Sequence, residues 1–185
     1  PAELKAGIED TGCLAHELSA QVFDPMLLEA ADAVGLSVVY HGQVLPALCL
    51  AAQIKAWRPD LPIVVGGPFF TVHRQVLKTQ AWLFDLIDAF VVFEGEDPLV
   101  GYLDCIDGAK TRAEAPGLIW RDDDGQVRES GMPVAVEVNK LPCPDFDGLP
   151  LDAYHLPEPT LPLLASRGCY WDCAFCTHHY IYGDS

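Results

Sequence analysis

Three short apolar runs, separated by stretches with helical spacing, most constrain how this chain can fold. The runs GLSVVY (35–40), LPIVVGG (61–67) and AFVVFEGE (89–96) have the length and the β-branched or aromatic character of buried strands. Residues 46–59 and about 71–85, between them, carry apolar residues at helical intervals. Strands that alternate with helices form a parallel sheet covered on both faces. We therefore expect an α/β fold with a doubly wound, Rossmann-like parallel sheet.

Local signals give the expected ends of several helices. Pro46 suits the first turn of the helix after the first run, and Pro59 ends it. Asp97, followed by a proline, is the expected N-cap of a helix over 97–106. Within residues 13–33, apolar and polar residues also alternate at helical spacing, so the chain is expected to be helical before its first strand.

The pattern changes after residue 110. Residues 115–130 hold two strand-like runs about an Asp124–Gly125 turn, which predicts a β-hairpin. The DDDG sequence at this turn lacks the ligand spacing of a calcium loop. Six prolines between 139 and 162 rule out a helix and predict an extended linker. A fresh strand is expected over 160–168. The predicted segments are an α/β domain, a hairpin extension, a Pro-rich linker and the start of another domain, at 1–110, 111–138, 139–160 and 161–185.

A cluster of three cysteines follows that last strand, with the spacing Cys169-x3-Cys173-x2-Cys176. Three thiolates in one short loop can hold three irons of a cubane cluster and leave the fourth iron open for chemistry. Phe175, directly before the last cysteine, would help to keep solvent from such a cluster.

Zinc is the main alternative for this loop. His178 and His179 follow the cysteines closely, so Cys169, Cys173, Cys176 and His178 could complete a tetrahedral zinc site. Structural zinc sites, however, usually place their ligand pairs a dozen or more residues apart. We favour iron–sulfur over zinc on spacing alone. A non-catalytic α/β binding module with a structural zinc site stays open as an alternative.

The remaining cysteines do not extend this site. The count of seven is odd and no secretion signal opens the chain, so a disulfide framework is disfavoured and a reducing cytoplasm is expected. Cys49 and Cys105 lie in apolar helical patterns and are expected to be small buried hydrophobes. Cys13 and Cys143 have no partner at metal-ligand spacing, and the sequence gives them no role.

The motif CxxxCx-aromatic-C resembles the cluster loop of the radical SAM superfamily. Cys169, Cys173, Phe175 and Cys176 match it position by position, after LPLLASRG as the strand that leads in. The α/β region with VVGGP and FEGE resembles the cobalamin-binding-like domain of the B12-binding branch, and the proline linker is typical of that branch. The resemblance spans nearly the whole chain. A cobalamin-type carrier domain with a disordered cluster loop stays open as a further alternative.

This resemblance implies a chemistry and a context. The three cysteines would hold a [4Fe–4S] cluster, whose open iron binds S-adenosylmethionine. An electron from a donor such as flavodoxin or ferredoxin would cleave S-adenosylmethionine, and a peptide or small-molecule substrate would be modified, with methylation as one outcome. The chain ends soon after Cys176, so we expect an N-terminal part of a larger enzyme, cut at the first barrel strand and inactive alone.

Cobalamin is left open by the sequence, because no histidine stands in a DxHxxG motif. If it binds, an open α/β sheet would hold it beyond the carboxyl ends of the strands. The candidate residues at these ends are Ser37, His41, Gly66, Gly67, Glu94, Gly95 and Glu96. Gly66 and Gly67 could equally serve a tight turn with positive φ, His41 could be an ordinary loop histidine, and the two glutamates could be a solvated pair.

Net charge disfavours one class of partner. With 27 acidic and 11 basic residues the chain carries −16, and most of such a surface repels a phosphate backbone, so nucleic acid is an unlikely partner. No apolar run approaches the roughly 20 residues of a membrane span, so no membrane partner is expected.

Overall fold

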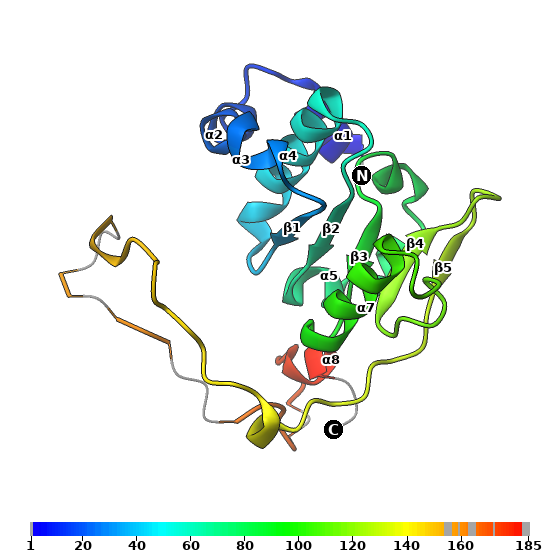
Figure 1. The fold of residues 1–185 in the computed structure, drawn as a ribbon, viewed down its shortest axis with the longest axis vertical. Coiled ribbons are helices and arrows are strands. Elements are labelled where there is room, and N and C mark those ends of the chain that lie inside the picture. Colours follow the sequence, from blue (N-terminus) through cyan, green and yellow to red (C-terminus); the bar gives the residue numbers. More distant parts are fainter. Residues whose placement is uncertain (1, 154–156, 159, 163–165, 172, 183–185) are drawn as a thin grey trace. The chain divides into compact units, whose positions relative to one another are not determined.

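The computed structural model describes residues 2–153, 157–158, 160–162, 166–171 and 173–182 (Figure 1). The chain divides into two compact units, Pro1–Pro133 and Val134–Ser185, and each is described by itself. The four segment boundaries expected from the sequence stay predictions.

The first unit is built on one five-stranded sheet in the order β1-β2-β3-β4-β5 (Figure 1). β1 to β3 are parallel, and β4 and β5 are antiparallel to their neighbours. The strands are β1 Val34–Ser37, β2 Ile63–Gly66, β3 Ala89–Val91, β4 Leu118–Arg121 and β5 Val127–Glu129. The predicted α/β fold with a parallel core and the predicted hairpin are therefore confirmed, and the hairpin continues the same sheet, which makes the sheet mixed.

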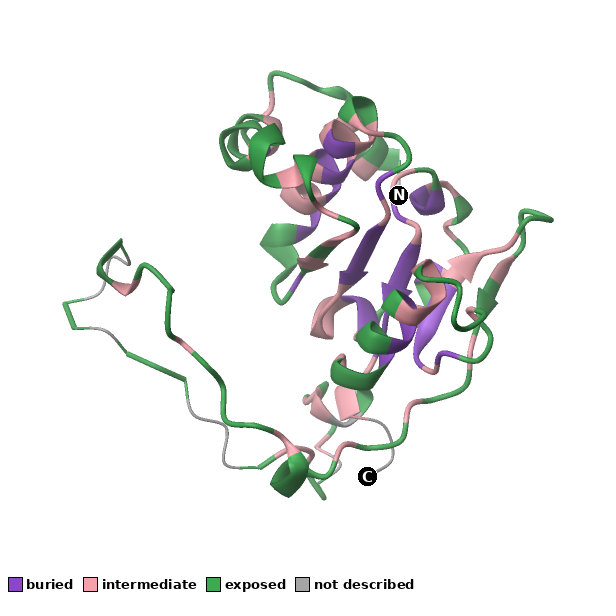
Figure 2. Ribbon diagram, in the orientation of Figure 1, coloured by how far each residue is buried: buried purple, intermediate pink, exposed green. Residues whose placement is uncertain are grey.

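Helices precede the sheet and connect its strands. Three of them come before β1, namely α1 Ala2–Glu9, α2 Leu14–Val22 and α3 Pro25–Glu29. Between β1 and β2 lie the 3₁₀ turn η1 His41–Gln43 and the helix α4 Val44–Trp57. The later connections contain α5 Pro68–Val72, α6 Arg74–Leu77, η2 Ala81–Asp85 and α7 Glu96–Ile106. Figure 2 shows the strands β2 and β3 buried, whereas α2 and α3 are largely exposed.

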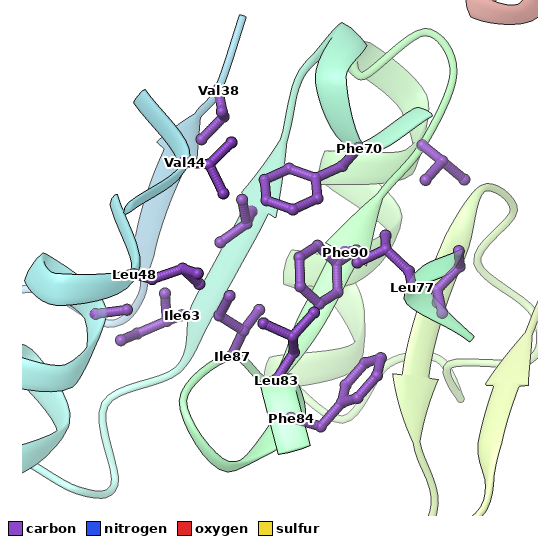
Figure 3. Close-up of a cluster of buried hydrophobic side chains, with 14 of the residues drawn as sticks. Val38, Val44, Leu48, Ile63, Phe70, Leu77, Leu83, Phe84, Ile87 and Phe90 are labelled. Atoms are coloured by element: carbon purple, nitrogen blue, oxygen red, sulfur yellow. The ribbon is translucent and has the colours of Figure 1, made fainter. Parts of the chain in front are cut away.

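Helices cover both faces of the sheet, because successive side chains of β2 point to opposite faces and three in a row are buried. Ile63 and Val65 point to the face on which α4, α5, α6 and η2 pack, and Val64 points to the face on which α7 packs. On the first face, the ring of Phe90 lies 4.9 Å from that of Phe70 and 5.4 Å from that of Phe84, centroid to centroid (Figure 3). On the second face, Tyr102 of α7 is buried against β2 and β3.

Several expected boundaries were wrong. The helical stretch 71–85 is broken into the end of α5, α6 and η2, because the backbone leaves the helical region at His73 (φ −96°, ψ 15°) and a turn follows α6. β3 ends at Val91, well before 96, because Phe93 takes a positive φ of 68°. Asp97 is not the cap of α7: the N-cap is Gly95, and the proline after Asp97 lies inside the first turn.

The second unit carries little regular structure among its described residues. These contain two 3₁₀ turns, η3 Val138–Lys140 and η4 Leu151–Ala153, and one short helix, α8 His178–Tyr182. The strand predicted at 160–168 falls partly on residues 163–165, which lie outside the described residues, and its described flanks are not in a strand. Among the described helices, none is long and apolar enough to cross a membrane.

Candidate functional site

The carboxyl ends of β1 and β2 are joined by a backbone contact that only glycine permits. The Val38 N–H donates to the Gly66 carbonyl at 2.9 Å, and Gly67 then turns with φ 105°. A Cβ at Gly67 would lie 2.4 Å from the Val38 carbonyl oxygen, far inside van der Waals contact. Gly67 is therefore fixed by the fold itself.

The loop after β3 is tied to the helix after β2 through Thr71. The Phe93 N–H donates to the Thr71 Oγ1 at 2.9 Å, and that hydroxyl donates to the Gly67 carbonyl at 3.4 Å. Thr71 has no exposed surface, so the bond is shielded from water. The Arg74 guanidinium lies 4.8 Å above the centroid of the Phe93 ring, a cation–π contact. The sequence alone gave no signal for Thr71, Arg74 or Phe93, because their contacts join separate loops.

On the α7 side of the sheet, small residues at the strand ends leave a strip of backbone that large side chains do not cover. Gly35 and Ser37 are exposed, and they pair with Val64 and Gly66 of β2. A Cβ at Gly35 would meet nothing within 4 Å, one at Gly66 would meet the Val91 carbonyl oxygen at 3.5 Å, and one at Gly95 would meet only the Val91 Cγ1, at 3.8 Å. We call this strip the glycine shelf; it consists of Gly35, Ser37, Gly66 and Gly95.

The protein's own packing does not explain the glycines of this shelf. Gly95 has φ −88°, and neither Gly35 nor Gly66 has a positive φ. The expectation that Gly66 needs a positive φ was wrong, whereas it holds for Gly67. Glycine without a steric or conformational reason often marks a place where a ligand approaches the backbone closely.

His41 lies away from the shelf. Its ring centroid is 6.0 Å from that of Phe69, and it lines a cavity of about 570 Å³ on the α4 side of the sheet. The walls of this cavity are largely apolar and include Leu48, Phe69, Phe70 and Trp82. The structure thus brings Ser37, Gly66 and Gly95 together and places His41 with the other face.

The two acidic candidates follow β3 as expected. Glu94 is half-buried in the loop, and Glu96 is exposed as the first residue of α7. A carboxylate in the first turn of a helix is stabilised by the helix dipole, which gives Glu96 a structural reason for its place.

The cysteine loop belongs to the second unit. The Cys176 N–H donates to the Cys173 carbonyl at 2.9 Å, and the His178 N–H donates to the Cys176 Sγ at 3.4 Å. Cys169 is exposed, Cys173 and Cys176 are half-buried, and Phe175 is 90% exposed. Among the described residues, no three His, Cys, Asp or Glu side chains are grouped closely enough to hold a metal ion. Cys173 and Cys176 therefore share a turn, but the sulfurs of the three predicted ligands are not gathered around one point.

The family model of the B12 binding domain matches residues 5–103 of this chain. This match covers more than half of the chain and includes β1, β2, β3 and the helices around them. The chain belongs to the B12-binding domain family. Its glycine shelf lies within the matched residues.

Curated relatives of this B12-binding domain are named as methyltransferases. The uncharacterized methyltransferase PH0819 of Pyrococcus horikoshii is 28% identical over 163 residues, 87% of this chain and 33% of that protein. The cytidylyl-2-hydroxyethylphosphonate methyltransferase of Streptomyces wedmorensis is 24% identical over 183 residues, 82% of this chain and 34% of that protein. The chain thus spans about a third of the length of these relatives.

Solved structures share the fold of this B12-binding domain. The cobalamin-dependent S-adenosylmethionine radical enzyme OxsB, with aqua-cobalamin and S-adenosylmethionine bound, matches with a TM-score of 0.52 and 22% identity over 63% of this chain and 16% of that one. The same enzyme with aqua-cobalamin alone matches with a TM-score of 0.50 and 21% identity. These matches agree with the α/β architecture described above.

Proposed function

We propose that the chain binds cobalamin at the carboxyl edge of its sheet and serves a radical SAM enzyme that modifies, and in particular methylates, a peptide or small molecule. The observation that carries this proposal is the glycine shelf within residues 5–103, the part matched by the B12-binding domain model. Cobalamin, when bound, supplies methyl-transfer chemistry.

The residues of the shelf fit a large, flat ligand with a polar rim. Bare backbone at Gly66 and Gly95 lets a planar macrocycle approach the strand ends. The exposed hydroxyl of Ser37 can exchange hydrogen bonds with amide groups at the ligand's edge, and the carboxylates of Glu94 and Glu96 can accept them. His41 opens on the other face, so it is not among the contacts proposed for this ligand.

Titration of the chain with aquacobalamin tests the shelf, with the absorption spectrum and calorimetry as readouts. We expect binding by the unmodified chain and about tenfold weaker binding by the double variant Gly66→Ala with Gly95→Ala, because two methyl groups then occupy the shelf. The Cβ distances of 3.5 and 3.8 Å predict an unchanged melting temperature. Gly12→Ala, in the turn before α2, is the matched control and should bind normally. Equal binding by all three proteins would place cobalamin elsewhere, and no binding by any would refute the assignment.

For the second unit we propose a [4Fe–4S] cluster on Cys169, Cys173 and Cys176. The support is chemical: three free thiols within eight residues, and a backbone N–H from His178 that stabilises the Cys176 thiolate. When bound, the cluster supplies the electron that cleaves S-adenosylmethionine. Phe175 would then cover the cluster against water. An electron donor such as flavodoxin or ferredoxin and a cytoplasmic setting belong to the same proposal.

Anaerobic reconstitution with iron and sulfide, followed by metal analysis and EPR, tests the cluster. The chain should bind iron and sulfide, and its reduced EPR signal should change when S-adenosylmethionine is added. Cys173→Ala should lose that signal, and Cys143→Ala, which removes an exposed cysteine outside the motif, should keep it. One zinc per chain, with His178→Ala abolishing zinc binding and no response to S-adenosylmethionine, would instead support the structural zinc site.

A further inference from the structure

Two cysteines far apart in the sequence meet where the α1–α2 corner packs on α4. The Cys13 Sγ donates to the Gly7 carbonyl at 3.3 Å, and the Cys49 Sγ donates to the same oxygen at 3.9 Å. Both sulfurs therefore lie against one backbone oxygen, which brings the two thiols close together. The sequence gave Cys13 no partner, and the fold supplies one.

Tight packing holds the two thiols in this arrangement. A Cβ at Gly7 would lie only 3.0 Å from both methyl carbons of Leu45, so α1 lies directly on the first turns of α4. Cys13 is half-buried and open to a reagent, whereas Cys49 is buried. Because a reagent reaches Cys13 and not Cys49, Cys13 reacts first. Burial, and then the neighbouring Cys13, raises the pKa of the Cys49 thiol, which adds to this order.

We propose that Cys13 and Cys49 form a dithiol site that a low-molecular-weight disulfide, such as oxidised glutathione, converts into an intramolecular disulfide. The Cys13 thiolate attacks one sulfur of the glutathione disulfide, whose S–S bond breaks and releases one glutathione thiolate. The Cys49 thiol then gives its proton to solvent and attacks the Cys13 sulfur of the mixed disulfide, which releases the second glutathione. Two protein thiols are oxidised, and one glutathione disulfide is reduced to two thiols.

This bond would fix α1 in place. Glu3 and Leu4 of α1 line the 570 Å³ cavity beside His41, so a link between the α1–α2 corner and α4 holds one wall of that cavity. Cys105, the cysteine of α7, serves as a comparison. Its thiol donates to the Gly101 carbonyl of the same helix at 3.0 Å, a contact that involves no other cysteine.

Peptide mapping of the whole chain tests the site. The chain is incubated anaerobically with oxidised glutathione, quenched with iodoacetamide and digested without reductant. We expect a linked pair of peptides that contain Cys13 and Cys49, with Cys105 recovered alkylated. Cys49→Ala should instead leave glutathione on Cys13, Cys13→Ser should leave Cys49 as a thiol, and the matched control Cys105→Ala should form the link as the unmodified chain does. Thermal melts confirm that each variant is folded.

Hydrogen exchange of the oxidised chain supplies a second readout. Amides of α1 should exchange several-fold more slowly after oxidation, and reduction should restore the original rate. The proposal would be overturned if glutathione stayed on Cys13 of the unmodified chain. It would also be overturned if Cys13 and Cys49 both remained thiols while the exposed Cys143 had reacted. A link that leaves α1 exchange unchanged would overturn its effect on α1. Neither readout depends on cobalamin or on the cluster.

Discussion

Gly66 and Gly67, at the end of β2, differ in whether the fold requires a glycine. Gly67 is held at φ 105° against the Val38 backbone, so the fold itself requires it. Gly66, one position earlier, has room for a methyl group and no unusual dihedral, so the fold does not require a glycine there. Paired glycines in a sequence do not reveal this difference, because it depends on what lies opposite each Cα.

Gly67→Ala should therefore lower the free energy of unfolding by about 3 kcal/mol or more, because the new Cβ would overlap the Val38 carbonyl oxygen at an already strained φ. Urea denaturation measures the change. Gly66→Ala is the matched control one residue away and should unfold at the urea concentration of the unmodified chain, or slightly above it. Equal losses for the two variants would contradict the distinction.

Thr71 holds two loops of the candidate site together with one hydroxyl. In Thr71→Val the shape is kept, but the Phe93 N–H loses its acceptor in a buried place, which should cost about 1–3 kcal/mol of unfolding free energy. Thr71→Ser keeps the hydroxyl and should recover most of that loss. Denaturant midpoints measure both effects, and a Val variant as stable as the Ser variant would show that the bond is not needed.

At the scale of elements, the hairpin owes its shape to Asp122. Its carboxylate accepts from the Arg128 Nε at 2.6 Å and from the Gln126 N–H at 2.8 Å, while Gly125 turns with φ 78°. The Arg128 guanidinium, and then the Gln126 N–H, lower the pKa of Asp122. Since the folded chain lowers this pKa, the stabilisation is present above the unfolded pKa of about 3.9 and is lost as the pH falls through the folded value.

Amide chemical shifts of the hairpin should show that loss. We expect the Gln126 and Arg128 signals to move towards random-coil values on acidification below about pH 4. Asp122→Asn should flatten this pH dependence, because the ion pair is then absent at every pH. Asp123→Asn, the neighbouring carboxylate, is the control and should leave the profile of the unmodified chain. A pH dependence that survives in Asp122→Asn would assign it to another group.

The sequence predicted the elements whose signals lie within a few neighbouring residues. It gave wrong ends for elements whose ends depend on contacts between loops. Three apolar runs gave the parallel strands, and an Asp-Gly pair gave the hairpin, because both signals lie within a few residues. The end of β3 at Val91 and the start of α7 at Glu96 were missed, because Thr71 pulls Phe93 into a positive φ from a different connection. Likewise Ser37, Gly66 and Gly95 were predicted in one set with His41 at the strand ends. Which members of that set share a face depends on strand register and on the loop after β3, and neither can be read from the sequence.

At the scale of the whole molecule, the chain spans about a third of its curated relatives and forms two units. The first unit carries the family match and the glycine shelf; the second carries the cysteine loop. The proposed cobalamin and cluster sites therefore lie on different units, and each can be tested without the other. This is why the titration with aquacobalamin and the reconstitution with iron have separate controls.

The net charge of −16 sets how the whole chain responds to salt. Repulsion among 27 acidic residues opposes the compact state, and raising ionic strength from about 0.01 to about 0.15 M shortens the screening length from roughly 30 Å to roughly 8 Å. Short ion pairs such as Lys55–Asp88, at 2.8 Å, lose attraction over the same range, but they involve the scarcer cations.

We therefore expect the melting temperature to rise by roughly 2–4 °C with sodium chloride over this range, because screening weakens the repulsion among acidic residues more than it weakens the attraction in the ion pairs. Calorimetry at fixed pH measures the rise, and sucrose at matched osmolality, which screens no charge, is the control and should raise it less. Replacing Asp32, which is exposed, by lysine should reduce the salt effect, because it removes one repelling charge and adds an attracting one. A melting temperature that falls with salt would mean that the ion pairs dominate.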